Sequence, residues 1–220
     1  AIAFQQLGLE VGVIDADIYG FSIPGMLGIH QRPVTVDKMI VPPVAHGLKT
    51  ISIGYFMEEG GAVLWRGPML HKAMQQFLSD VHWGELDVLL IDMPPGTGDV
   101  AISLGNLIPH AEAVVVTTPQ AAAQRVAERA AAVSERVGMK VTGVIENMAA
   151  YTLPDGTVVD LFGSGGGAAV AEAKDPFAIA RLARRTAADR LFLGFGADAF
   201  EFGHGFKGLQ DAPLSTRKAL

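Results

Sequence analysis

The stretch VLLIDMPPGTGD, residues 88–99, decides the fold class. Its first four residues form a continuous apolar run, which is typical of a strand buried on both faces of a parallel sheet. The run stops at an aspartate, and a turn rich in proline and glycine follows. Ligands of open α/β sheets bind beyond the carboxyl ends of the strands, so this turn is a candidate binding site.

Similar apolar runs that end in polar residues recur along the chain, at 11–14, 51–53, 62–65, 113–116 and 141–145. Helical patterns separate many of them, at 1–7, 69–80, 99–108 and 120–137. We expect Thr118 to cap the last of these helices, with Pro119 as its first residue. The alternation predicts an α/β fold of three layers, in which a mostly parallel sheet carries helices on both faces.

Composition narrows the functional classes. The chain has 220 residues, a net charge of −6 and no cysteine. Disulfides, thiolate metal sites and cysteine nucleophiles are therefore excluded within it. The acidic balance argues against a nucleic-acid partner, and no apolar run reaches the roughly 18–20 residues that span a bilayer. We expect a cytoplasmic protein without a nucleic-acid or membrane partner.

Asp92 is the first candidate site residue. A carboxylate at the tip of a buried strand suits Mg²⁺, which keeps several waters and needs one or two protein carboxylates. The glycines that follow let backbone N–H groups approach a γ-phosphate. The alternative is an ordinary strand-end turn, because Asp, Pro and Gly are common turn residues.

Asp15 and Asp17 form the second candidate, in the stretch VIDADIYG at 13–20. Two carboxylates at one strand tip repel each other unless a cation or a reacting water uses them. Asp17 would polarise a water that attacks the γ-phosphate, and Asp15 would support the magnesium shell. In the alternative, one of them caps a short helix and the other is solvated.

Weaker candidates follow from single residues. Arg66, between a tryptophan and a glycine, suits a phosphate or carboxylate, or is simply a surface residue. Asn147 follows the strand at 141–145, and its carboxamide suits an adenine edge, although most such residues form turns. The glycine cluster at 163–167 is interpreted as a flexible turn.

Together these strings resemble the Mrp family of P-loop ATPases, the bacterial iron–sulfur cluster carriers, within the wider group that includes MinD, ParA and nitrogenase iron protein. The matching strings appear in family order: DADIYG (15–20), SIP (22–24), WRGPM (65–69), QQFL (75–78), WGELD (83–87), IDMPPGTGD (91–99), TTPQ (117–120) and GVIENM (143–148).

The resemblance implies ATP with Mg²⁺, a homodimer with nucleotide near its interface, and transfer of iron–sulfur clusters to apoproteins. By matching position, Asp17 would be the catalytic switch carboxylate near the attacking water. Asp92 would hold Mg²⁺ through water, with Asp15 supporting the cofactor site. Gly96 would lie in the second switch, and Asn147 would face adenine.

The chain departs from the family pattern at three places. No Gly-Lys-Ser or Gly-Lys-Thr occurs, so we expect the P-loop and its central strand to precede Ala1 and the strand at 88–91 to lack one neighbour. Little ATP affinity is then expected. Residues 151–157 replace the Cys-x-x-Cys pair of many members, which argues against cluster binding. The ending differs too, which divides the chain into an NTPase-like core, 1–173, and a divergent segment, 174–220.

Three functions remain open on sequence alone. The first is an ATPase of the iron–sulfur carrier type, inactive without its P-loop. The second is a MinD- or ParA-like switch that acts on a membrane or DNA, which would need a basic amphipathic tail or face. The third is a non-catalytic, truncated remnant.

Overall fold

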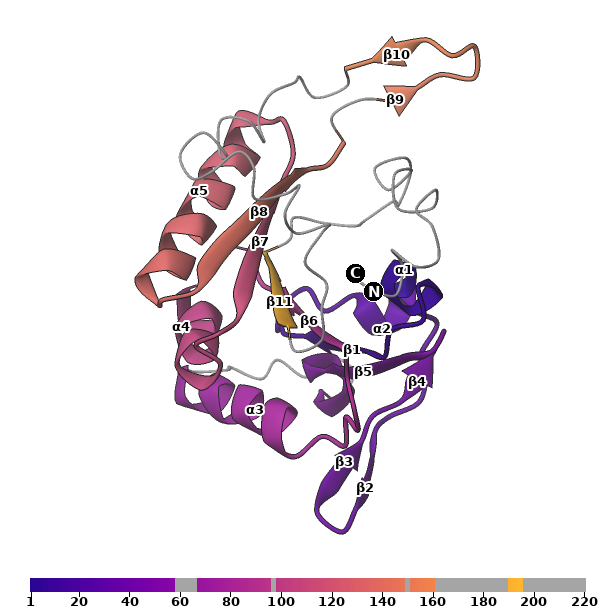
Figure 1. Ribbon diagram of the computed structural model, residues 1–220, viewed down its shortest axis with the longest axis vertical. Coiled ribbons are helices and arrows are strands. Elements are labelled where there is room, and N and C mark those ends of the chain that lie inside the picture. Colours follow the sequence, from indigo (N-terminus) through magenta and orange to yellow (C-terminus); the bar gives the residue numbers. More distant parts are fainter. Residues whose placement is uncertain (58–66, 96–97, 149–150, 161–189, 196–220) are drawn as a thin grey trace.

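The structure is a computed structural model of the 220-residue chain, shown in Figure 1. It describes residues 1–57, 67–95, 98–148, 151–160 and 190–195. The predicted strand at 62–65, the glycine cluster at 163–167 and the candidates Arg66 and Gly96 lie outside these ranges.

A seven-stranded sheet forms the centre of the fold. Its strands lie in the order β4 (Val44–Ala45), β5 (Leu48–Ser52), β1 (Val11–Asp15), β6 (Val88–Met93), β11 (Arg190–Phe195), β7 (Glu112–Thr117) and β8 (Lys140–Glu146). Every neighbouring pair is parallel except β4 with β5. The carboxyl ends of β5, β1, β6, β11, β7 and β8 therefore share one edge.

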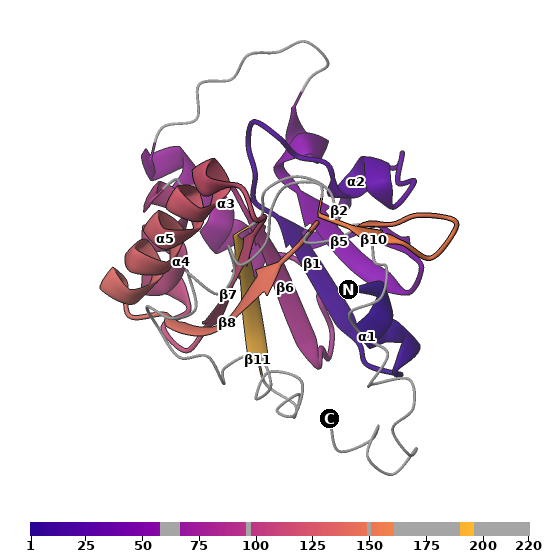
Figure 2. The same cartoon turned by 90° about the horizontal axis from the view of Figure 1, so that it is seen from above.

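Helices cover both faces of this sheet, as Figures 1 and 2 show. One face carries α3 (Gly67–Ser79), α4 (Gly98–Leu107) and α5 (Ala121–Arg136), and the other carries α1 (Ile2–Gln6) and α2 (Ile23–Met26). Ile14 and Ile91 pack in the large core on the first face, whereas Val11 and Val13 pack against α1 and α2. The predicted three-layer α/β architecture is confirmed.

Short elements complete the described chain. Two antiparallel hairpins are formed by β2 (Val34–Val36) with β3 (Met39–Val41) and by β9 (Tyr151–Thr152) with β10 (Val158–Val159). A 3₁₀ turn, η1 (Ile53–Phe56), follows β5 directly. The second hairpin turns at Pro154, Asp155 and Gly156, which are residue types common in turns.

The predicted cap of α5 is wrong. Its N-cap is Gln120, which has an extended backbone and no side-chain cap bond. Strand β7 runs on to Thr117, so the turn to the helix needs Thr118, Pro119 and Gln120. Thr118 thus lies in the turn, two positions before the N-cap, which is too early to cap the first helical N–H groups.

The prediction that β6 lacks a neighbour on one side is also wrong. Strand β11, from the segment 174–220, lies between β6 and β7 and pairs in parallel with both. Leu193 is opposite Ile91 on one side and Ala113 on the other. The backbone N–H and C=O groups of β6 on this side therefore bond to β11. Buried backbone groups need such partners, because leaving them unpaired costs free energy.

Gly12 in the middle of β1 makes a testable contribution to packing. A Cβ there would lie 2.8 Å from methyl carbons of Leu86 and Leu89 and 2.9 Å from the ring of Trp83. We expect Gly12→Ala to lower the free energy of unfolding by about 1–2 kcal/mol, because overpacking outweighs the entropy gained. Gly25→Ala, where nothing lies within 4 Å, is the control and should be neutral or stabilising. Equal denaturation midpoints for Gly12→Ala and the parent chain would contradict this.

Candidate functional site

Three carboxylates meet at the carboxyl edge of the sheet. Asp15 ends β1 and is directly opposite Asp92 of β6 in the parallel register. The backbone N–H of Ala16 donates to the Asp92 carbonyl over 2.8 Å, which holds the two strand ends together. Asp17 follows two residues later, and both its charge and that of Asp15 act on Asp92. The predicted convergence of these acids is confirmed.

Asp15 organises the loop that follows β1. One of its carboxylate oxygens accepts hydrogen bonds from the N–H groups of Ser22 and Ile23, each 3.1 Å, and from the Ser52 hydroxyl, 3.2 Å. The other accepts the N–H of Asp17 at 3.3 Å. Burial raises the pKa of the Asp15 carboxyl, and these hydrogen bonds oppose the rise. The side chain therefore fixes the path of residues 15–23.

Asp17 is half-buried and forms a tight turn of its own. Its Oδ1 accepts the N–H groups of Tyr19 at 3.1 Å and Gly20 at 3.0 Å. Gly20 lies against this carboxylate, because a Cβ there would lie 2.8 Å from Oδ2 of Asp17. Within the described part of the chain, Oδ2 makes no hydrogen bond, so this oxygen is available to a water or a ligand.

Asp92 has the most perturbed acidity of the three. Burial, followed by the charges of Asp15 and Asp17, raises the pKa of the Asp92 carboxyl to about 7. Unlike Asp15, it has no protein donor that stabilises its ionised form among the described residues. A carboxylate in this state is stabilised by a nearby cation.

A second group of polar residues lies further along the same edge. Thr117 ends β7, and its carbonyl accepts the N–H of Asn147 at 2.8 Å. The Asn147 Oδ1 accepts the N–H of Met148, 2.9 Å away, at a residue with a positive φ of 56°. The hydroxyl of Thr118 is buried and has no hydrogen-bond partner in the described structure. An unpaired buried hydroxyl costs free energy unless a ligand or water satisfies it.

The two groups are too far apart for one ion. Strands β11 and β7 separate β6 from β8, so Asp92 and Asn147 are about 14 Å apart at the usual strand spacing. A ligand that touches both groups must be extended, as a nucleotide is. Among the described residues, no cluster of three or more His, Asp or Glu side chains is arranged to hold a metal by itself.

A pocket of about 320 Å³ lies beside this edge and is not bounded by any of the three carboxylates. Its walls come from the segment after Asp17 and from η1. Within the described ranges, no helix is long and apolar enough to cross a membrane.

Comparison with known families decides the relationship. The model of the ParA family described as NUBPL iron-transfer P-loop NTPase matches residues 1–188. The chain belongs to this family. The match ends just before β11 and includes the carboxyl ends of β5, β1, β6, β7 and β8.

Curated relatives support the assignment. An iron-sulfur cluster carrier protein of Mycobacterium tuberculosis is 55% identical over 194 residues, which is 88% of this chain and 49% of that protein. Its counterpart in Bacillus subtilis is 45% identical over 173 residues, 78% of this chain and 49% of that protein. The chain thus spans about half the length of these relatives.

A solved structure agrees with the fold. A nucleotide-binding protein from Archaeoglobus fulgidus, in complex with ADP, superposes with a TM-score of 0.64 at 30% identity. The superposition covers 90% of this chain and 74% of that one. The chain therefore shares its α/β fold with a protein that binds a nucleotide.

Sequence reasoning missed two residues of the site. Ser52 bonds Asp15 although it lies on a different strand, and only the register of β5 with β1 brings it there. Thr118 was assigned to a helix cap, whereas its hydroxyl is buried and unpaired at the carboxyl edge, within the described structure. The paired threonines at 117–118 were a visible signal, because a polar pair after an apolar strand marks its tip.

Proposed function

We propose that this chain is the nucleotide-dependent part of an iron–sulfur cluster carrier of the Mrp type, which binds and hydrolyses ATP with Mg²⁺ in the cytoplasm. The observation that carries the proposal is the group of three carboxylates at the carboxyl edge, with the pKa of Asp92 near 7. Burial and the neighbouring charges of Asp15 and Asp17 both disfavour the ionised Asp92. A nearby cation favours it, and magnesium bound to a triphosphate is such a cation.

The residues present fit MgATP at both ends of the site. Mg²⁺ needs one or two carboxylates, which Asp92 supplies through water. In this proposal, the unpaired hydroxyl of Thr118 and the amide of Asn147 would meet the base or ribose of an extended nucleotide. Bound MgATP would supply the phosphoryl group that is transferred to water.

Each carboxylate has a distinct role in this proposal. Asp17 orients the attacking water with its Oδ2, while its Oδ1 stays fixed by the turn at Tyr19 and Gly20. Asp15 supports the cofactor site by holding the loop 15–23 through Ser22 and Ile23. Gly96 lies outside the described residues, and its role in the second switch stays a prediction.

Two parts of the machinery must come from outside these 220 residues. No Gly-Lys-Ser or Gly-Lys-Thr occurs in the chain, so the amide cradle and lysine of a P-loop are not supplied by it. Iron–sulfur clusters are held by cysteine thiolates, and the chain has none. We therefore propose that the cluster, as cargo for apo iron–sulfur proteins, is held by ligands outside this chain or across a homodimer that includes such ligands.

The hydrolysis step is tested with the chain extended ahead of Ala1 by the phosphate-binding segment of a curated relative. We expect Asp17→Asn to lower the rate of magnesium-dependent ATP hydrolysis about 100-fold, the scale of a lost water-orienting carboxylate. The measurement is phosphate release at saturating ATP, with binding of a fluorescent ATP analogue as a check on affinity.

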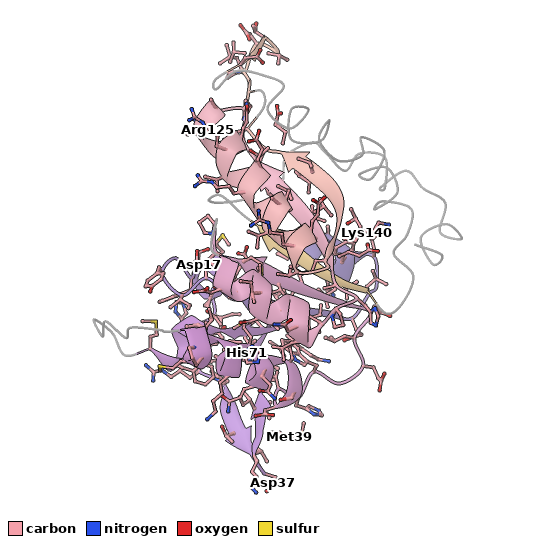
Figure 3. All side chains as sticks on the ribbon, turned by 90° about the vertical axis from the view of Figure 1, so that its left-hand side faces the viewer. Asp17, Asp37, Met39, His71, Arg125 and Lys140 are labelled. Atoms are coloured by element: carbon pink, nitrogen blue, oxygen red, sulfur yellow. The ribbon has the colours of Figure 1, made fainter. Side chains whose placement is uncertain are left out.

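Asp37→Asn is the matched control, because it makes the same chemical change on an exposed residue. Figure 3 shows Asp37 at the tip of the β2–β3 hairpin, well away from Asp17. Its rate should equal that of the parent protein. No hydrolysis by the extended parent, or an unchanged rate in Asp17→Asn, would contradict the proposal.

A further inference from the structure

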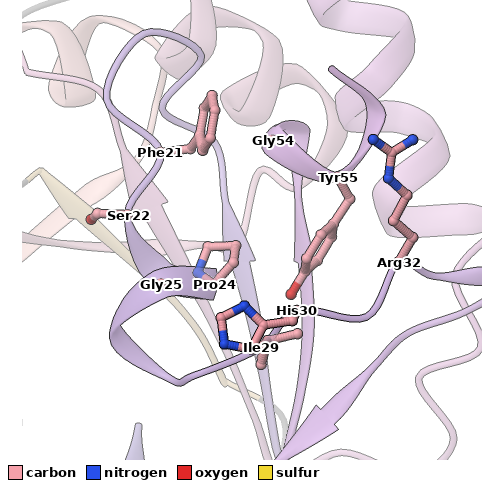
Figure 4. Close-up of a pocket in the computed structure, with 9 residues that line it drawn as sticks. All are labelled: Phe21, Ser22, Pro24, Gly25, Ile29, His30, Arg32, Gly54 and Tyr55. Atoms are coloured by element: carbon pink, nitrogen blue, oxygen red, sulfur yellow. The ribbon is translucent and has the colours of Figure 1, made fainter. Parts of the chain in front are cut away.

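The pocket beside the carboxyl edge has no role in nucleotide binding as proposed above. Figure 4 shows it between the loop after Asp17 and η1. Its volume of about 320 Å³ suits one bulky side chain. Its lining combines apolar side chains with the imidazole of His30 and the guanidinium of Arg32; the others are Phe21, Pro24, Ile29 and Tyr55.

The base of the pocket is apolar, and its one polar group, the Tyr55 hydroxyl, already has a hydrogen-bond partner. Ile29 and Tyr55 are buried, with 9% and 8% of their surfaces exposed. The Tyr55 hydroxyl shares a hydrogen bond of 3.1 Å with the Thr50 hydroxyl, so it makes no demand on a ligand. Filling such a base with an aliphatic or aromatic side chain removes apolar surface from water and is favourable.

Gly54 shapes the pocket on the η1 side. A Cβ at this position would lie 2.4 Å from the Phe21 ring. The absence of a side chain is therefore what lets Phe21 lie against the backbone of η1 and leaves the space between Phe21 and Tyr55 open. Any larger residue at Gly54 would push the Phe21 ring out of this position.

The described part of the rim carries a guanidinium and no acid. Arg32 and His30 are both exposed, and the described residues that line the pocket include no Asp or Glu. Within the described structure, no ion pair is formed by Arg32. Figure 4 places Arg32 and Phe21 on opposite sides of Gly54 and Tyr55. An exposed guanidinium without an ion pair, like that of Arg32, pairs readily with a carboxylate.

Exposed apolar side chains continue beyond the pocket. Met26 and Phe56, which adjoin pocket residues in the chain, have 54% and 49% of their surfaces exposed. Phe21 itself is 40% exposed. Apolar surface gathered around a pocket is typical of a protein-binding site, and it extends further than a free small acid would cover.

We propose that this pocket docks a peptide segment of a partner protein, which inserts one bulky apolar side chain and pairs a neighbouring carboxylate with Arg32. The proposal rests on the proposed function only for the kind of partner, an apo iron–sulfur protein. The chemistry of recognition rests on the pocket alone.

Both walls of the pocket are tethered to Asp15, which links docking to the nucleotide site. On one wall, the N–H groups of Ser22 and Ile23 donate to Asp15. On the other, the Gly54 N–H donates to the Ser52 hydroxyl over 3.1 Å, and that hydroxyl donates to the same Asp15 oxygen. A ligand that shifts either wall thus acts on the loop that carries Asp17, and the coupling is reciprocal.

The test uses nucleotide-free protein, so it is independent of ATP hydrolysis. The probe is a fluorescein-labelled hexapeptide, Ser-Asp-Leu-Phe-Asp-Ser, and binding is followed by fluorescence anisotropy. We expect saturable binding that weakens at least about 10-fold when both aspartates of the peptide become asparagine, or when Arg32 becomes glutamine, as for a charge-assisted pair. Lys38→Gln, a cation on the hairpin tip outside the pocket, is the control and should bind like the parent.

Gly54→Ala gives a second test, because it moves the Phe21 ring without changing charge; circular dichroism verifies that each variant is folded. Loss of binding in folded Gly54→Ala places the peptide in the pocket. Absence of saturable binding, or equal binding by the Arg32→Gln variant, would overturn the proposal. So would 3-phenylpropionate competing as tightly as the unlabelled peptide, since the pocket would then take a free acid.

Discussion

Replacing Leu193 by proline is expected to lower the free energy of unfolding by roughly 3 kcal/mol, because β11 is paired on both sides. In a parallel strand each backbone N–H is directed at one neighbour or the other, and Leu193 lies between Ile91 and Ala113. Proline removes that donor and leaves a buried carbonyl of β6 or β7 without a partner. Urea denaturation of the 220-residue chain measures the change.

Leu193→Ala separates the backbone effect from the loss of the side chain, and the proline variant should be clearly less stable than the alanine variant. Equal stability of the two would show that β11 does not hold the centre of the sheet. The family resemblance predicts that the P-loop strand lies beside β6, where β11 lies in this structure. Both strands cannot occupy the same place in the sheet. In the chain extended ahead of Ala1, a negligible effect of Leu193→Pro would therefore show that the added strand displaces β11.

The sheet and its acidic edge were predictable because they depend on local patterns. Continuous apolar runs identified β1, β6, β7 and β8, and the parallel topology followed from the intervening helices. Once strands are parallel, their carboxyl ends share an edge. The meeting of Asp15, Asp17 and Asp92 follows from these two steps without any knowledge of side-chain contacts.

The parts that sequence reasoning did not find depend on long-range pairing. The residues of β11 do not indicate that the strand inserts between β6 and β7. That pairing depends on which backbone N–H and C=O groups of the other strands would otherwise lack a partner. Ser52 reaches Asp15 only through the register of β5 against β1. Thr118 was misassigned because a Thr-Pro pair fits a helix start as well as it fits a strand-end turn.

Asp92→Asn is expected to stabilise the chain above neutral pH by up to about 4 kcal/mol, because it removes a carboxylate whose folded-state pKa lies far above its unfolded value. The pKa of Asp92 is about 7 in the folded chain, against 3.8 as the ordinary value. Between about pH 4 and pH 7 the unfolded state therefore binds fewer protons than the folded state. The contribution of Asp92 to the free energy of unfolding therefore falls as the pH rises through that window, and it is fully present below about pH 4.

The difference in unfolding free energy between Asp92→Asn and the parent isolates this residue from every other titrating group. It should be near zero at pH 4, grow as the pH rises to 7, and stay constant above, whereas Asp37→Asn should follow the parent throughout. A flat difference would contradict the crowding of Asp15, Asp17 and Asp92. Because magnesium favours the ionised form, MgATP should stabilise the chain extended by the phosphate-binding segment at pH 8 more than it stabilises the Asp92→Asn variant of that extended chain. The burial and the neighbouring charges that make ionised Asp92 destabilising are thus what a bound cation would offset. This connects the pH dependence of folding to the proposed chemistry.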